Sequence, residues 1–261
     1  MKVNYFINQL RSKGRYSFSL NEAVQYLNLP KVSILKTLQR MKKQGSVASV
    51  AKGFYLVVPP EYQSFGCLPA DLFISDLMQF LRLPYYVGYL SAAQLYGAAH
   101  QKPQRFQVVT LKNRRPIRCG RIAIEFIANK KMESLPTQKL KTATGYINVA
   151  EPELLAADLI NAPQHAGGIN NVATILMELA NSFDIARFKK LAVINAEVFW
   201  IQRLGYLFDI LEMERLADGL GKILDNKTYY WLKLVPDKKY QALSRNAKWK
   251  IIVNTDVEPD E

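Results

Sequence analysis

The sequence predicts an α+β protein with an N-terminal helical module, two short strands, and then a mixed domain with a small sheet and a helical bundle. Three observations carry this prediction. Apolar residues recur at helical spacing through residues 2–43. After Pro103 the spacing changes, and Ile122, Ile124 and Phe126 alternate, which is typical of a strand. Over residues 151–225 the helical spacing returns. At 261 residues the chain suits two domains better than one.

The first two helices follow from apolar spacing and a cap. A helix is expected over residues 2–13, and its predicted inward residues are Val3, Phe6, Ile7 and Leu10. Ser19 and Glu22 have the spacing of a capping box for a second helix. The turn at residues 28–31 ends that helix, and residues 16–18 can form a small strand.

The next helix, expected from Val32 until Gly45 stops it, has a basic face. Leu35, Leu38 and Met41 recur at steps of three, which we interpret as the inward stripe. Residues 47–50 and 54–58 then read as two strands of a hairpin with a lysine at its tip. The residues of this segment predicted to bind DNA are Lys31, Ser33, Lys36, Thr37, Arg40, Lys43 and Lys52.

Helix, turn, basic helix and hairpin together describe a winged helix-turn-helix, in which the second helix of the motif enters the major groove. A basic helix face can also be a solvated surface, and winged helices also serve as protein-interaction modules. Charge favours DNA, because residues 1–58 contain ten Lys or Arg and one acid, Glu22. We predict a DNA-binding domain over residues 1–60, ended by Pro59-Pro60, and a second domain over residues 61–261.

The second domain is expected to combine helices and strands. The helices are expected over residues 70–83, from a Ser91 cap to Gly97, and through residues 151–225. The strands are expected over residues 106–111, 122–127 and 144–149, with late strands at 229–234 and 249–253 that return to the same sheet.

A second basic region covers residues 102–141, with eleven basic residues against two acids. Its central loop contains a possible second basic patch, Lys112, Arg114, Arg115 and Arg118. The patch could bind nucleic acid or an acidic partner. It could equally be a set of solvated loops, since lysine and arginine at a sheet edge discourage edge pairing.

Signatures of enzymes and cofactors are missing. The chain lacks a phosphate-binding glycine loop, HExxH, GxSxG and CxxC, so we expect no catalytic residue, no cofactor and no metal. His100 and His165 are isolated in sequence and are expected to be loop or core residues. Four carboxylates could in principle converge as a nuclease metal site: Glu125, Glu151, Glu153 and Asp158. Helix capping, however, explains Glu151 and Glu153, and alternation on a strand explains Glu125.

The cysteines, the N-terminus and the lengths of the apolar runs indicate the compartment. Cys67 and Cys119 are far apart in sequence and lack metal-ligand spacing, so reduced thiols are expected. The N-terminus lacks the apolar core of a signal peptide, and no apolar run approaches the ~20 residues of a membrane span. We expect a cytoplasmic protein that does not bind membranes.

The chain also resembles a known family. Four stretches carry the resemblance: YYVGYLSAAQLYGAAHQKPQRFQVVT from residue 85, INVAEPELLAADLI from residue 147, WIQRLGYLFDIL from residue 200 and WKIIVN from residue 249. Together with the predicted winged helix, their order resembles the AbiEi family, the antitoxins of type IV toxin–antitoxin systems. In that family a histidine often precedes the glycine of the central helix, where this chain has Tyr96-Gly97; we expect that position to be structural.

The resemblance implies a bacterial regulator that represses its own operon through the N-terminal domain. It also implies that the C-terminal domain counteracts a nucleotidyltransferase toxin, without a stable toxin–antitoxin complex being required. The alternative is a stand-alone winged-helix transcription regulator whose C-terminal domain senses a ligand or protein partner. One winged helix covers few base pairs and no apolar stripe indicates a dimer, so we expect a monomer in solution with two copies on operator DNA.

Overall fold

The computed structural model describes residues 2–99, 103–225, 227–238 and 244–259. The chain divides into two compact units and passes between them repeatedly. Unit 1 consists of Met1–Tyr86, Gln104–Glu133 and Lys139–Asn148, and unit 2 of Val87–Pro103, Ser134–Gln138 and Val149–Glu261. Helices and mixed sheets occur together, which confirms the α+β class.

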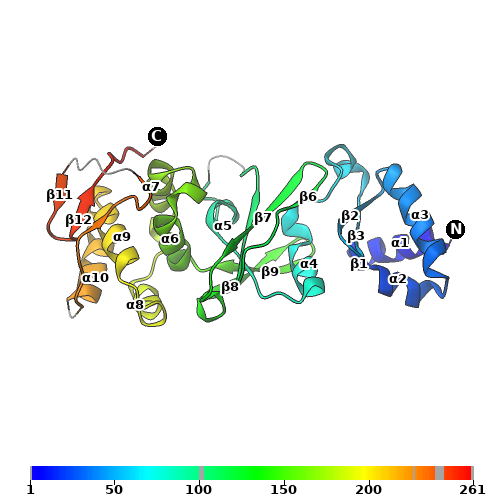
Figure 1. Ribbon diagram of the computed structural model, residues 1–261, viewed down its shortest axis with the longest axis horizontal. Helices are drawn as coiled ribbons and strands as arrows, with labels where there is room; N and C mark the ends of the chain where they lie inside the picture. The colour runs from blue at the N-terminus through cyan, green and yellow to red at the C-terminus, as the bar shows by residue number, and fades with distance from the viewer. Residues whose placement is uncertain (1, 100–102, 226, 239–243, 260–261) are drawn as a thin grey trace. The chain divides into compact units, whose positions relative to one another are not determined.

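Unit 1 begins with a segment of helices and a three-stranded antiparallel sheet (Figure 1). Its elements are α1 (Lys2–Ser12), β1 (Ser17–Ser19), α2 (Leu20–Leu27), α3 (Lys31–Lys43), β2 (Val47–Ala51) and β3 (Phe54–Val57). The strand order is β1-β3-β2, so the short strand expected near residue 17 pairs beside the hairpin.

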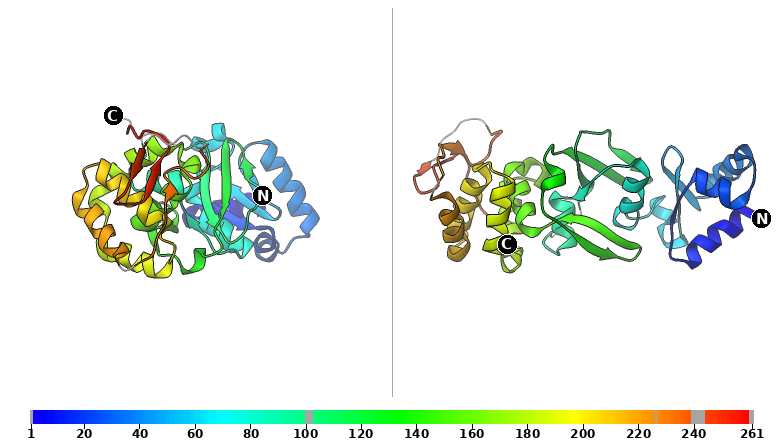
Figure 2. Two further views of the ribbon diagram at one scale, coloured as in Figure 1. Left: turned by 60° about the vertical axis from the view of Figure 1, so that its left-hand side comes forward. Right: turned by 90° about the horizontal axis from the view of Figure 1, so that it is seen from below.

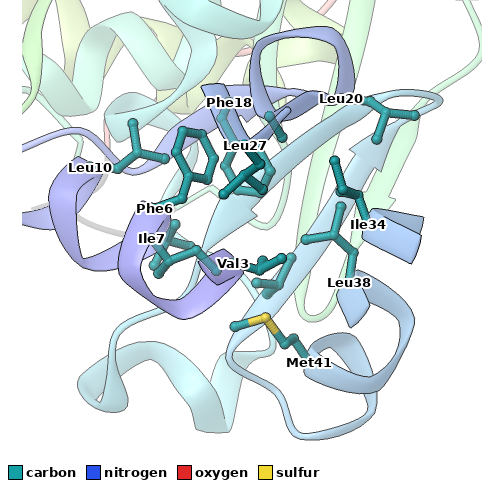
Figure 3. Packing of buried hydrophobic residues seen from close by; sticks show 13 residues of the cluster. Val3, Phe6, Ile7, Leu10, Phe18, Leu20, Leu27, Ile34, Leu38 and Met41 are labelled. Carbon is teal, nitrogen blue, oxygen red and sulfur yellow. The ribbon is translucent and has the colours of Figure 1, made fainter. Parts of the chain in front are cut away.

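A single apolar cluster holds these elements together, and Figure 3 shows its side chains meeting between the helices and strands. The four inward residues predicted for α1 are all buried. Phe6 meets Phe18 edge-on, with ring centroids 5.3 Å apart. Burying a large apolar side chain contributes about 1.5–3 kcal/mol relative to leaving it exposed, so the cluster is the main stabilising feature of this segment.

The inward stripe of α3 differs from the predicted one at one residue. Ile34 is fully buried, whereas Leu35 is 37 % exposed. Leu38 and Met41 are buried as predicted. Because each residue advances about 100° around a helix, steps of three drift by about 60° each, while the spacing 34, 38, 41 stays on one side. The prediction of Leu35 as an inward residue was therefore wrong.

The predicted capping box at the start of α2 is half formed. The Ser19 hydroxyl accepts a hydrogen bond from the Glu22 backbone N–H at 3.0 Å. The Glu22 carboxylate, however, pairs with Arg15 at 2.8 Å instead of turning back to Ser19. Asn28 ends the helix in the left-handed conformation, with φ 48°.

The rest of unit 1 contains short helices and most of a sheet. Its helical elements are η1 (Pro60–Phe65), η2 (Ala70–Leu72), α4 (Ile74–Leu81) and η3 (Met132–Ser134). The expected single helix over residues 70–83 is broken at Phe73, whose φ of −138° is not helical. Strands β5 (Phe106–Thr110) and β7 (Ile122–Ala128) pair in parallel, and β6 (Ile117–Cys119) pairs antiparallel with β7.

Two strands of this sheet were not predicted. β6 lies within the basic stretch, and β8 (Thr137–Thr142) within a polar one. With β4 (Tyr86–Val87) and β9 (Gly145–Ala150), the sheet has the order β6-β7-β5-β4-β9-β8. Both missed strands are at its edges, where side chains stay wet and the apolar alternation that predicts a strand is weak.

Unit 2 is mostly helical. Its helices are α5 (Tyr89–Leu95), α6 (Pro152–Asn161), η4 (Pro163–Ala166), α7 (Ile169–Glu178), η5 (Ala180–Ser182), α8 (Ile185–Ile194), α9 (Phe199–Ile210) and α10 (Glu214–Leu224). The helical character predicted for residues 151–225 is confirmed. Ser91 is not the cap of α5: Gly88 occupies that position, and Ser91 is buried within the helix.

The late strands form a sheet of their own. β10 (Leu232–Lys233), β11 (Ser244–Asn246) and β12 (Ile251–Val253) have the order β10-β12-β11 and do not return to the earlier sheet, so that expectation was wrong. The buried Trp249 anchors this sheet, since its ring lies where a side chain at Gly205 of α9 would have to be. Figure 2 shows the orange and red strands beside the yellow and orange helices. Within the described residues, no helix has the length and apolarity needed to cross a membrane.

Candidate nucleic-acid interface

The outer face of α3 carries the basic residues that the sequence singled out. Ile34, Leu38 and Met41 fix the inner side of the helix. Lys36 and Arg40 are therefore turned outward, since they are displaced from that stripe by roughly half a turn. Lys43 follows one turn later on the same face, and all three are exposed.

Ser33 and Thr37 lie at the edge of this face and are linked to each other. The Thr37 hydroxyl donates to the Ser33 carbonyl at 3.0 Å, a bond within the helix. Thr37 is half-buried and Ser33 exposed. The exposed Ser33 side chain is therefore accessible to a ligand. The Thr37 hydroxyl already donates its hydrogen, so it can only accept a further hydrogen bond.

Lys31 and Lys52 mark the two ends of the surface. Lys31 is the first residue of α3 and is exposed. Lys52 is exposed at the tip of the β2–β3 hairpin, next to Gly53, whose φ of 84° closes the turn. The end of the hairpin next to this turn is anchored, since the Phe54 ring packs 5.2 Å from that of Phe80 in α4.

The charge of this surface is uncompensated by neighbours. Glu22, the single acid among residues 1–58, is already paired with Arg15 at 2.8 Å. Within the part of the chain that the structure describes, no ion pair involves the five bases Lys31, Lys36, Arg40, Lys43 and Lys52. Counter-ions or a polyanion must therefore supply the opposite charge.

The second basic patch lies in the same unit as α3. Lys112, Arg114 and Arg115 are exposed in the loop between β5 and β6, and Arg118 is exposed on β6 itself. The Arg114 guanidinium lies 6.0 Å from the centroid of the Phe126 ring, so part of its side chain covers apolar surface.

β6 also lies against β2 of the hairpin, and two cysteines meet near that contact. The Cys119 thiol lies 3.9 Å from the Ser49 carbonyl. A hydrogen bond between the two buried thiols raises the pKa of Cys67 and lowers that of Cys119. Both are free cysteines. Their contact was not predicted, because it depends on the close backbone approach of Gly66 and Gly120.

The four carboxylates considered as a metal site do not converge. Within the described residues no group of three or more His, Cys, Asp or Glu could hold a metal ion. Glu125 pairs with Arg105 at 3.8 Å, and Glu151 is the residue before α6. Asp158 lies near Tyr89, whose pKa is raised mainly by burial and further by the Asp158 charge.

Glu153 is unexpectedly buried. Only 1 % of its surface is exposed, and its carboxylate accepts the Asp184 backbone N–H at 2.8 Å. Burial raises its pKa. The apolar residues that follow it in α6 were the available sequence signal, since they surround the helix and leave it no solvated side.

Of the two histidines and Tyr96, the structure describes His165 and Tyr96, each with structural partners of its own. His100 lies outside the described residues. The His165 ring packs against Tyr89, with centroids 5.2 Å apart. The Tyr96 hydroxyl donates to the Ala150 carbonyl at 2.6 Å and accepts from Gln138 at 2.6 Å, a structural arrangement within unit 2.

Comparisons with known proteins address both fold and family. Residues 86–210 match the sequence profile of the AbiEi antitoxin C-terminal domain. The crystal structure of the RV2827C protein from Mycobacterium tuberculosis is similar, with a TM-score of 0.69 over 94 % of this chain and 89 % of that chain. At 15 % identity this likeness indicates a shared fold. No curated protein sequence matches the chain.

Proposed function

We propose that the protein, whose residues 86–210 match the AbiEi antitoxin C-terminal domain, is the antitoxin of a type IV toxin–antitoxin system and represses its own operon. In this proposal residues 1–60 bind operator DNA as a winged helix-turn-helix. Residues 61–261 counteract a nucleotidyltransferase toxin encoded in the same operon, without a stable complex being required.

The observation that supports DNA binding is the uncompensated basic face of α3, held outward by Ile34, Leu38 and Met41. The order α1-β1-α2-α3-β2-β3 is the order of a winged helix, with α3 in the position of the recognition helix. Lys36 and Arg40 would reach into the major groove. Lys43 and the hairpin residue Lys52 would contact phosphates on either side.

A gel-shift assay on the promoter of the chain's own operon tests these roles. A base-reading contact contributes about 1–3 kcal/mol of discrimination, whereas a phosphate contact weakens all sequences alike and lowers the salt slope by about one. Arg40→Ala should therefore reduce specific binding more than non-specific binding, and Lys52→Ala should weaken both. Lys190→Ala, an exposed lysine of α8, is the matched control. Unchanged binding by both α3 and hairpin variants would rule out this surface.

Rescue of cell growth tests the antitoxin role. Co-expression with the nucleotidyltransferase gene adjacent to this one should restore growth, and the Lys36→Ala/Arg40→Ala variant should do so equally well. If the adjacent gene is of another kind and the protein does not restore growth in cells that express a nucleotidyltransferase, a stand-alone regulator that senses a ligand or partner would be favoured.

The second basic patch is proposed as part of the antitoxin surface. Serine at Lys112, Arg114, Arg115 and Arg118 should weaken rescue while leaving folding stability within about 0.5 kcal/mol, since all four are exposed. Full rescue together with normal repression would leave the patch as a solvated sheet edge.

The expected oligomeric state depends on how much DNA one winged helix can contact. We expect a monomer in solution and two copies on a repeated operator, because one winged helix makes few base contacts. A promoter footprint that covers one unrepeated half-site would contradict this arrangement.

A further inference from the structure

The outer face of the C-terminal sheet carries aromatic and basic side chains. Register defines this face: Lys233 of β10 and Arg245 of β11 both lie opposite Ile252 of β12, and paired residues point to the same side. The neighbouring residues Ile251 and Val253 are buried on the other side. Trp231 lies two residues before Lys233 and so shares the outer face.

An arginine and a tryptophan already stack on this face. The Arg245 guanidinium lies 5.7 Å from the centroid of the Trp231 ring. Trp231 directly precedes β10 and Arg245 belongs to β11, the two strands that flank β12 in the sheet. Trp231 is 45 % exposed, and the neighbouring Tyr230 is 76 % exposed. Next to them, the Lys250 ammonium lies 4.5 Å from the centroid of the Tyr229 ring.

Buried polar groups of α9 hold the backbone below these rings. The Gln202 amide is fully buried and donates to the carbonyls of Tyr230 and Trp249, at 2.9 Å each. The Arg203 side chain donates to the Lys233 carbonyl at 2.9 Å. The exposed aromatic residues are therefore attached to a rigid support and not to a free tail.

The charge of this segment reverses that of the preceding helices. Residues 227–250 contain seven Lys or Arg and one acid, Asp237, whereas residues 151–225 contain eleven acids and six bases. One of the seven, Lys248, is paired with Asp209 at 2.8 Å. Arg245 is exposed and forms no ion pair within the described residues.

We propose that the outer face, formed by Trp231, Lys233 and Arg245, binds single-stranded RNA. Bases would stack on the open side of the Trp231 ring, extending its stack with Arg245, and phosphates would contact the surrounding lysines. A duplex cannot use such a platform, because its bases already stack on one another. An acidic protein would need the charge but not the exposed aromatic rings. RNA is chosen because it supplies most unpaired bases in a cell.

Tryptophan fluorescence gives a direct test on the full-length chain. Of the three tryptophans, Trp200 and Trp249 are buried, so quenching by an added ligand reports Trp231. An RNA of about 12 uridines, within the size range that such sites cover, should quench the emission to saturation, and added salt should weaken the binding. Trp231→Leu should abolish the quenching and weaken binding, measured by anisotropy of labelled RNA, by roughly 5- to 150-fold. Arg245→Gln should weaken it as well.

Matched variants separate this site from the proposed DNA surface. Lys222→Gln, an exposed lysine of α10, should bind RNA as the wild type does. The Lys36→Ala/Arg40→Ala variant should lose operator binding and keep RNA binding. Trp231→Leu should lose RNA binding and keep operator binding, so the two proposals are tested independently. Equal RNA binding by Trp231→Leu and wild type would overturn the inference. So would equal competition by poly-glutamate or by duplex RNA.

Discussion

At the scale of single residues, Glu153 links protonation to folding. Its pKa is raised by burial, so the folded state holds the proton more tightly than the unfolded chain does. The stability that this provides is fully present below the unfolded pKa of about 4.3 and is lost as the pH rises through the folded pKa. Glutamine cannot ionise, so Glu153→Gln removes this pH-dependent contribution to stability.

Urea denaturation at pH 4.5 and pH 8 measures the effect. The free energy of unfolding of the wild type, relative to Glu153→Gln, should fall between the two pH values. Glu61→Gln, an exposed carboxylate of unit 1, is the control for a surface exchange. A difference between wild type and Glu153→Gln that stays constant with pH would contradict the assigned pKa direction.

Gly120 is a second residue with a specific structural requirement. Its φ is 56°, and a Cβ there would lie 2.1 Å from the Phe65 carbonyl oxygen, which belongs to the backbone and cannot rotate away. Gly120→Ala should therefore cost about 2–4 kcal/mol, combining strain and displacement. Gly14→Ala, with φ 67° and no atom within 4 Å of the added Cβ, should cost only about 1–2 kcal/mol. Equal losses in thermal denaturation would show that the close backbone approach is unimportant.

At the scale of elements, the register of α3 decides which residues face solvent. Ile34→Ala should cost about 2–5 kcal/mol, because the fully buried side chain leaves a cavity. Leu35→Ala should cost only about 1 kcal/mol, since Leu35 is 37 % exposed at the flank of the helix and leaves no enclosed cavity. Denaturation midpoints of the two variants check the register. The reverse order would restore Leu35, Leu38 and Met41 as the buried side of α3.

At the scale of the whole molecule, the proposed boundary at residue 60 lies within unit 1. Ser49 contacts Cys119, and Phe54 packs on Phe80, so both sides of the boundary share buried surface. A chain of residues 61–261 should therefore melt at a lower temperature than the full chain, because it exposes Phe80 and Cys119. If its cellular level is matched to that of the full chain, it should still rescue growth from the toxin.

Two results of this deletion experiment would contradict the expectations. An unchanged melting temperature would indicate that the first 60 residues contribute no stabilising contacts to the remainder. Loss of rescue at a normal protein level would refute the proposed division of labour between residues 1–60 and 61–261.

Local patterns were sufficient to predict much of this protein. The helices of residues 2–43 and 151–225 were predictable because helical hydrogen bonds and apolar spacing involve residues close in sequence. The Ser19 cap and the hairpin around Lys52 are equally local. The concentration of positive charge in residues 1–58 is a property of composition alone.

Tertiary structure decided whatever depends on distant partners. The edge strand β6 forms because β7 offers it a hydrogen-bonded neighbour, and β12 pairs with β10 and β11 instead of the earlier sheet. The same holds for the contact of Cys67 with Cys119, the burial of Glu153 beneath Asp184, and the stack of Arg245 on Trp231. In each case the sequence supplies the side chain, but its environment exists only once segments far apart in the chain pack together, since burial and pairing are properties of the folded core.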